Sequence, residues 1–128
     1  MMLERHFIVT HTETDEKLVL ASSVNNEFFL VPWIEARSIS MMIPFENSKD
    51  LEIYKNNNIY RHYKGSIYKT YFEASHINTG EIFIIYSSDE YEKKSIYWAR
   101  PKEMFHSYYN DTNVLRFTLI NEGEIKNV

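Results

Sequence analysis

The chain repeats part of itself at a spacing of 65 residues. Under that shift, with no gap, eight of the 28 positions from 6 to 33 carry the same residue in both copies: Phe7/Phe72, His11/His76, Thr14/Thr79, Glu16/Glu81, Ser22/Ser87, Ser23/Ser88, Glu27/Glu92 and Trp33/Trp98. Such a period predicts two related structural units, a tandem duplication. The alternative is that two hairpins look alike without common origin. The shift also aligns Glu35 with Arg100, so a basic site is expected in the second copy alone.

Alternation of apolar and polar residues predicts that both copies consist of strands. We expect strands at 6–10, 17–22, 27–31 and 37–43, and then at 59–63, 67–75, 81–87, 96–100 and 114–120. Asn78-Thr79-Gly80 predicts a hairpin turn, because Gly accepts the positive φ of short loops. Residues 89–94 are expected to form a charged loop. Pro101 predicts the start of a helical turn over 102–105.

Composition limits the classes of protein that this chain can be. Aromatic residues make up 16% of its 128 residues, which gives a short chain enough bulk for a core. The absence of Cys excludes disulfides, thiol catalysis and Cys-based zinc sites. No apolar run is long enough to cross a bilayer and the first residues lack a signal-peptide core, so we expect a cytoplasmic protein without membrane contact.

Charge is distributed unevenly along the chain. The net charge of −4 argues against broad coating of DNA, which needs many Lys and Arg side chains against phosphates. Residues 1–58 have a net charge of −4, whereas residues 59–109 have a net charge of +1. A local anion site in the second half is therefore compatible with the sequence.

The second half carries a series of ordered motifs. They are Tyr60-Arg61-His62-Tyr63-Lys64-Gly65, then His76, Thr79-Gly80-Glu81, Trp98-Ala99-Arg100-Pro101, Met104-Phe105 and Arg116-Phe117. In this order and spacing, about half of the chain resembles the bacterial domain-of-unknown-function family 1653. The resemblance implies an SH3-like barrel and brings no catalytic residues with it. Ala99 stands where that family usually has Val, and the 89–94 loop is longer and more charged than usual.

The resemblance and the repeat together give an all-β fold. We expect an abbreviated β-unit at 1–45, a connector at 46–58, an SH3-like barrel at 59–121 and a flexible tail at 122–128. Nothing like residues 60–65 precedes His6, so the first unit lacks a strand. Either it forms a smaller sheet packed on the second unit, or the strand comes from elsewhere, for example from a second subunit in a homo-oligomer.

The richest candidate ligand-binding site consists of Arg61, Tyr63, Lys64, Trp98 and Arg100. Side chains alternate between the faces of a strand, so Arg61 shares a face with Tyr63 and Trp98 shares one with Arg100. Guanidinium groups beside aromatic rings can hold a phosphate or carboxylate and stack a planar group. The competing interpretation is that the rings are core, the arginines pair with Glu81 or Glu103, and the motif is a folding signature.

Beside this candidate site, the His residues and the possible catalytic motifs are the other sources of metal binding or catalysis in the sequence. No two His residues have the helical spacing of metal ligands, and no catalytic motif is present, so we expect no enzyme activity, metal or cofactor. His11 and His76 recur at the same hairpin position. They are predicted to be structural, with the imidazole bonded to nearby backbone or to Glu16 and Glu81.

The expected function is a non-catalytic binding or adaptor module that acts through an aromatic-basic surface on a protein or nucleic-acid partner. This expectation is by analogy with other SH3-like barrels. The alternative is a protein that binds or sequesters a small anionic ligand such as a nucleotide. A phage-borne accessory inhibitor of a host system would fit either hypothesis.

Overall fold

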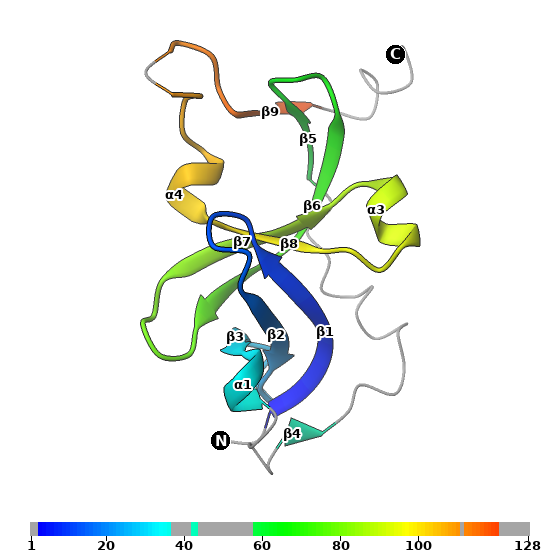
Figure 1. Cartoon of the computed structure of the whole chain (residues 1–128), viewed down its shortest axis with the longest axis vertical. Coiled ribbons are helices and arrows are strands. Elements are labelled where there is room, and N and C mark those ends of the chain that lie inside the picture. The colour runs from blue at the N-terminus through cyan, green and yellow to red at the C-terminus, as the bar shows by residue number, and fades with distance from the viewer. Residues whose placement is uncertain (1–2, 37–41, 44–57, 111, 121–128) are drawn as a thin grey trace.

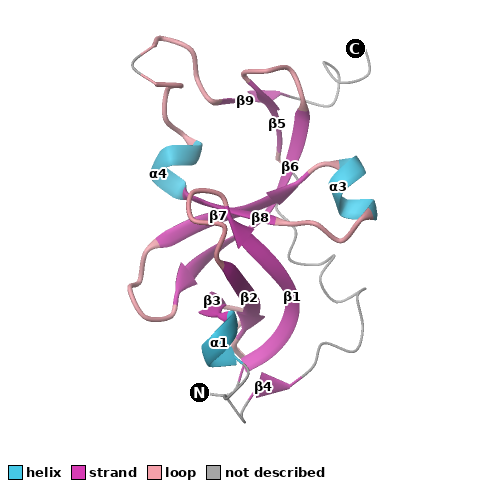
Figure 2. Cartoon of the chain, in the orientation of Figure 1, coloured by secondary structure: helices cyan, strands magenta, loops and turns pink. Residues whose placement is uncertain are grey.

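The computed structural model describes residues 3–36, 42–43, 58–110 and 112–120 (Figure 1). The strands are β1 Leu3–His11, β2 Lys17–Ser22, β3 Phe28–Pro32, β4 Met42–Ile43, β5 Ile59–His62, β6 Ile67–His76, β7 Ile82–Ser87, β8 Trp98–Pro101 and β9 Phe117–Ile120. The short helices are α1 Trp33–Ala36, α3 Asp89–Lys93 and α4 Lys102–Phe105 (Figure 2). The predicted all-β fold with a small barrel is confirmed. The predicted tail, the connector apart from Asn58, and residues 37–41 lie outside the described residues.

Six strands close into a barrel, in the order β3-β2-β1-β8-β7-β6 and back to β3. Within each half of the chain the pairing is antiparallel: β1 with β2 and β2 with β3, then β6 with β7 and β7 with β8. The halves join through two parallel contacts, β1 with β8 and β3 with β6. Beyond the barrel, β6 continues into pairing with β5, and β5 pairs with β9.

The barrel is shared by the two halves, whereas the sequence led us to expect one within 59–121. A three-stranded meander is too narrow to close on itself, and it leaves an unpaired strand at each edge. Each meander here places its two edges against those of the other, which satisfies the backbone groups of both. The strand that the first unit lacked comes from the same chain. The pair Met42–Ile43 lies parallel to Leu3–Glu4, where the second unit has β5 against Tyr68–Lys69.

The two units correspond in register as well as in sequence. Phe7 pairs with Leu20, and Phe72 pairs with Ile85, each one position after a β-bulge. In the turns, the backbone N–H of His11 donates to Glu16 at 2.9 Å, and that of His76 donates to Glu81 at 2.9 Å. The parallel contacts are equivalent too: Thr10 pairs with Trp98 as Ser75 pairs with Phe29. Such reciprocal contacts are what a two-fold relation between the units produces.

The third strands correspond at a different spacing from the first two. Leu18 pairs with Pro32, and its equivalent Phe83 pairs with Pro101, a separation of 69 residues rather than 65. The connection before β8 is therefore four residues longer and contains α3. The ungapped alignment of Glu35 with Arg100 is thus wrong. The residue that occupies the position of Arg100 in the first unit is Val31, since these two pair with the equivalent residues Val19 and Ile84.

Alternating side chains of both units fill the inside of the barrel. The buried core combines Val9, Leu18, Leu20 and Leu30 with Tyr71, Phe72, Ala74, Phe83, Ile85 and Ala99. The neighbours of these residues along each strand point outward, where a second layer of packing forms under α1 and under α4.

Candidate functional site

An open groove lies outside the barrel in the second unit. Its lining residues are Thr12, Tyr68, Tyr86, Tyr91, Trp98 and Arg100, and its volume is about 190 Å³. We call it the aromatic groove. Strand pairing builds much of it: Tyr86 of β7 lies directly opposite Trp98 of β8, and Arg100 follows Trp98 on the same face.

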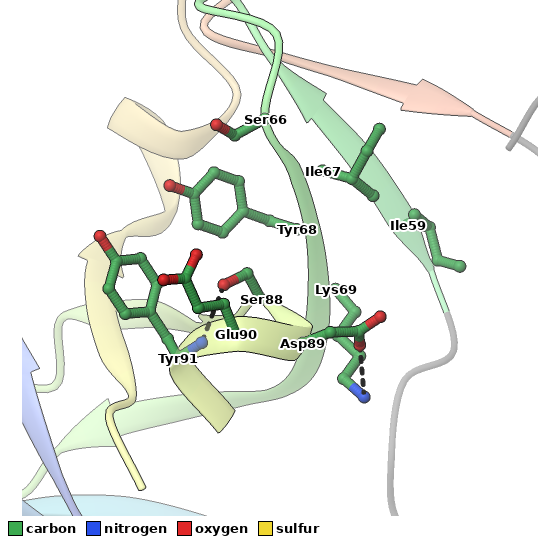
Figure 3. Close-up of a pocket in the computed structure, with 9 residues that line it drawn as sticks. All are labelled: Ile59, Ser66, Ile67, Tyr68, Lys69, Ser88, Asp89, Glu90 and Tyr91. Atoms are coloured by element: carbon green, nitrogen blue, oxygen red, sulfur yellow. Dashed lines mark hydrogen bonds and ion pairs between the residues drawn. The ribbon is translucent and has the colours of Figure 1, made fainter. Parts of the chain in front are cut away.

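A larger hollow of about 440 Å³ adjoins the groove and shares Tyr68 and Tyr91 with it. We call it the α3 hollow. In Figure 3 the rings of Tyr68 and Tyr91 lie on one side of β6, with Ser88 and Glu90 beside them, while Ile59 and Ile67 lie on the other side. Both volumes together are in the range of sites that take small ligands or peptide side chains.

Helix α3 forms one wall of this hollow and is fixed at both ends. The Ser88 hydroxyl accepts a hydrogen bond from the backbone N–H of Tyr91 at 3.1 Å, which caps the helix. Lys69 of β6 forms ion pairs with Glu92 at 2.7 Å and with Asp89 at 3.5 Å. The Tyr71 hydroxyl donates a hydrogen bond to Glu92. The α3 end of the site is therefore acidic, with Asp89 and Glu90 exposed along it.

Arg100 is the charged residue among those lining the aromatic groove, and its side chain is only 14% exposed. Its Nε donates to the Tyr86 hydroxyl at 3.2 Å, and its guanidinium carbon lies 5.7 Å from the centre of the Phe117 ring. One Nη atom lies 3.4 Å from Glu13 Oε1, in the turn between β1 and β2. The guanidinium is thus held in place at the end of the groove opposite the acidic helix.

Two phenols and one imidazole near Arg100 are uncharged near neutral pH. Burial raises the pKa of Tyr68 and of Tyr86, so both phenols stay protonated and can donate hydrogen bonds. His62 lies beside Phe117 and Tyr68. Burial lowers its pKa, and the positive charges of Arg100, Lys64 and Arg116 lower it further. Near neutral pH the positive charge of the groove therefore comes from Arg100.

Comparison of the two sides of the barrel shows that the groove positions carry different residues on each side. On the side of the first unit the equivalent positions are Leu3, Ala21, Phe29, Val31 and, from the second unit, Ile77. These residues pack into an apolar cluster with Val19 and Ala36. On the side of the second unit the same positions carry Tyr68, Tyr86, Trp98, Arg100 and, from the first unit, Thr12. An apolar cluster suffices for packing, as the first unit demonstrates. The set on the second side adds hydroxyl, indole and guanidinium groups to its packed rings, and the inserted helix α3 lies beside it.

The five residues singled out from the sequence separate into two groups. Trp98 and Arg100 lie together in the aromatic groove. Tyr63 stacks on Tyr109 at a ring distance of 3.9 Å, and the Lys64 ammonium lies 5.7 Å from the Tyr63 ring. Arg61 lies on the face of β5 opposite to Tyr60 and His62, whose rings contact Phe105 and Phe117. Neither Arg61, Tyr63 nor Lys64 lines the groove.

Four groove residues escaped the sequence analysis: Thr12, Tyr68, Tyr86 and Tyr91. Thr12 comes from the first unit, and Tyr91 comes from the inserted helix, so no local pattern joins them to Trp98. A signal for Tyr68 and Tyr86 was present in the repeat. Under the 65-residue shift they replace the apolar Leu3 and Ala21.

The turn histidines have the structural role that the sequence predicted. His11 Nδ1 accepts a hydrogen bond from the backbone N–H of Glu13 at 3.0 Å, and His76 Nδ1 accepts one from Asn78 at 3.2 Å. His62 Nδ1 accepts from Lys64 at 3.2 Å in the β5–β6 turn. In the part of the chain that the structure describes, no three His, Asp or Glu side chains converge as metal ligands would.

Residues 58–119 match the model of the family described as a protein of unknown function, DUF1653. The match confirms the resemblance over this segment, which is just under half of the chain. In the structure, the DUF1653 segment contains β5 to β8 and most of β9, and thus every groove residue except Thr12. No curated protein and no solved structure matches the chain.

The described helices are all too short to cross a membrane.

Proposed function

We propose that this protein is a non-catalytic binding module that takes an extended segment of a protein partner into the aromatic groove and the α3 hollow. The observation that supports this most is the contrast between the units. Positions that form an apolar cluster beside the first unit carry Tyr, Trp and Arg around an open groove beside the second. Tyr, Trp and Arg are the residues most enriched where proteins bind one another.

The charges at the two ends favour a peptide over a nucleic-acid strand. Arg100 lies at one end, and Asp89 and Glu90 lie at the other. Lys69 also lines the hollow, but its ammonium is already paired with Glu92 and Asp89. A polyanionic strand running along the site would therefore meet a net negative charge at this end, which repels phosphate groups. A peptide can place an acidic group at Arg100, an apolar or aromatic side chain among the tyrosines, and a basic group beside α3.

A random peptide library displayed on phage and selected on the protein tests this proposal. Selected peptides are then titrated into a Trp33→Phe background, which leaves Trp98 in the groove as the fluorescent reporter. We expect an acidic residue and a basic residue flanking an aromatic or apolar one. Tyr91→Ala should weaken binding by about tenfold, because aromatic residues at the centre of an interface each contribute more than about 1 kcal/mol.

Tyr108→Ala is the matched control, because this tyrosine is 58% exposed and does not line the groove. Both variants should keep the wild-type melting temperature. If the selected peptides bind Tyr91→Ala and Tyr108→Ala equally well, the proposed site is wrong. If no peptide is selected and mononucleotides change the Trp98 fluorescence instead, the small-ligand alternative replaces the peptide.

A further inference from the structure

The contact between Arg100 and Glu13 connects the two units across the end of the groove. Arg100 belongs to β8, whereas Glu13 lies in the turn between β1 and β2. The same Glu13 oxygen accepts a hydrogen bond from the hydroxyl of Thr12, a groove-lining residue, at 3.4 Å. The carboxylate thus lies at the mouth of the aromatic groove.

In this ion pair Arg100 is firmly held, whereas Glu13 is not. Arg100 contacts Tyr86 and Phe117 and is mostly buried. Glu13 is 41% exposed, and the distance of 3.4 Å between its Oε1 and the Arg100 Nη atom is long for a charge-assisted hydrogen bond. Partly exposed pairs of this kind contribute little to stability. A carboxylate that approaches Arg100 with better alignment, and binds both Nη atoms, would displace Glu13 at little cost.

The pair is also confined to the side of the molecule that has the groove. In the first unit, Val31 occupies the place of Arg100, and the residue equivalent to Glu13 is Asn78. Asn78 instead donates a hydrogen bond to Glu35 at 2.9 Å. The equivalent turn has the same backbone hydrogen bonds without a carboxylate at this position, so Glu13 is not required for the geometry of the turn.

We infer that Glu13 occupies the position that a ligand's carboxylate takes on Arg100, so that the groove selects peptides with an acidic group at this end and Glu13 competes with them. This inference rests on the proposed function. The carboxylate can be an Asp or Glu side chain or a chain terminus, because Arg100 recognises the same chemical group in each case.

The test uses two compounds that differ only in charge: N-acetyltyrosine, which carries a carboxylate, and N-acetyltyrosine amide, which does not. Both are titrated in the Trp33→Phe background with Trp98 fluorescence as the readout. Glu13→Gln should tighten binding of the acid by about two- to fivefold, the effect of removing a weak competing pair, and leave the amide unchanged. Arg100→Met should abolish the preference for the acid, a loss of about tenfold or more.

The double variant separates competition from a general change in charge. In Arg100→Met the further substitution Glu13→Gln should not change the affinity for the acid, because the guanidinium for which Glu13 and the ligand compete is absent. Acetate should displace N-acetyltyrosine from Glu13→Gln more effectively than chloride does at equal ionic strength. Amidation of the selected peptides distinguishes a terminal carboxylate from a side chain.

Three results would overturn the inference: equal tightening of acid and amide by Glu13→Gln, an acid preference that survives in Arg100→Met, or no binding of either compound to Glu13→Gln while selected peptides still bind. These failures leave the peptide-binding proposal standing, since peptides would still depend on Tyr91. If neither the compounds nor any peptide binds, the proposed function and this inference fall together.

Discussion

His6 connects the stability of the barrel to pH. It lies on β1 at the bulge, where its Nε2 is 2.7 Å from the Ser22 hydroxyl and its ring lies 5.9 Å from that of Phe28. Burial lowers its pKa to about 4, against 6.5 for an ordinary histidine. Between these two values the unfolded chain binds a proton that the folded chain does not. Protonation of His6 in the unfolded chain therefore does not lower the free energy of unfolding above pH 6.5, and it lowers this free energy progressively as the pH drops toward 4.

We expect the free energy of unfolding to decrease by about 1 kcal/mol between about pH 7 and about pH 5 because of His6, after allowance for its partial exposure. His6→Gln should remove this part of the pH dependence while it keeps a hydrogen-bonding partner for Ser22. Urea unfolding of both proteins at the two pH values measures the difference. Parallel pH curves for wild type and His6→Gln would contradict the assignment.

Gly80 and Asp15 occupy the same position in the two equivalent turns. Their φ angles are +75° and +61°, both in the left-handed region that favours glycine. A Cβ at Gly80 would meet no atom within 4 Å, so substitution there tests the backbone alone. Gly80→Ala should lower the free energy of unfolding by about 1 kcal/mol, and Gly80→Asp by less, because Asp tolerates this conformation better. An unchanged urea midpoint for Gly80→Ala would show that the turn adjusts freely.

At the scale of elements, α3 is the part of the site most open to a direct test. Glu92 connects it to β6 by accepting from both Lys69 and Tyr71. Glu92→Gln should loosen the helix and increase amide hydrogen exchange in residues 89–95 by roughly tenfold, without changing β7, because a local opening does not need the barrel to unfold. Glu90→Gln is the control, since Glu90 is 79% exposed and its pair with Lys94, at 3.6 Å, lies within α3 and its C-terminal cap. Equal exchange in the two variants would contradict the role of Glu92.

Elements whose signals are local were predictable from the sequence. The strand 17–22, the Gly80 turn and the helical turn at 102–105 each follow from alternation or from a turn residue, and the structure contains all three. Helix α3 was instead expected to be a charged loop. Ser88 followed by three acidic residues within four positions is a helix start, but five residues are too few to show periodicity.

The site was only partly predictable, for a related reason. Trp98 and Arg100 belong together because they are two residues apart on one strand. Tyr68, Tyr91 and Thr12 reach them through barrel closure and an insertion, and neither of these has a local sequence signal. The ungapped repeat hid the insertion and aligned Trp33 with Trp98, two residues that occupy different places in the fold.

At the scale of the whole molecule, barrel closure makes the two units depend on each other. Leu20 and its equivalent Ile85 are fully buried in one core that draws residues from both units. Each unit also supplies the partner for the edge strands of the other. The two units should therefore unfold in a single cooperative transition, even though only the second matches a family model.

The two tryptophans make this expectation measurable, because Trp33 lies in the first unit and Trp98 in the second. Trp98→Phe and Trp33→Phe each leave one reporter, and the two reporters should give the same urea midpoint. Leu20→Ala, a change confined to the first unit, should cost about 2–5 kcal/mol and lower both midpoints equally. Ile85→Ala, a change confined to the second unit, should also lower both midpoints equally. If Leu20→Ala shifted the Trp33 transition and left the Trp98 transition in place, residues 58–120 would be stable alone, and the shared barrel would not be the cooperative unit of this fold.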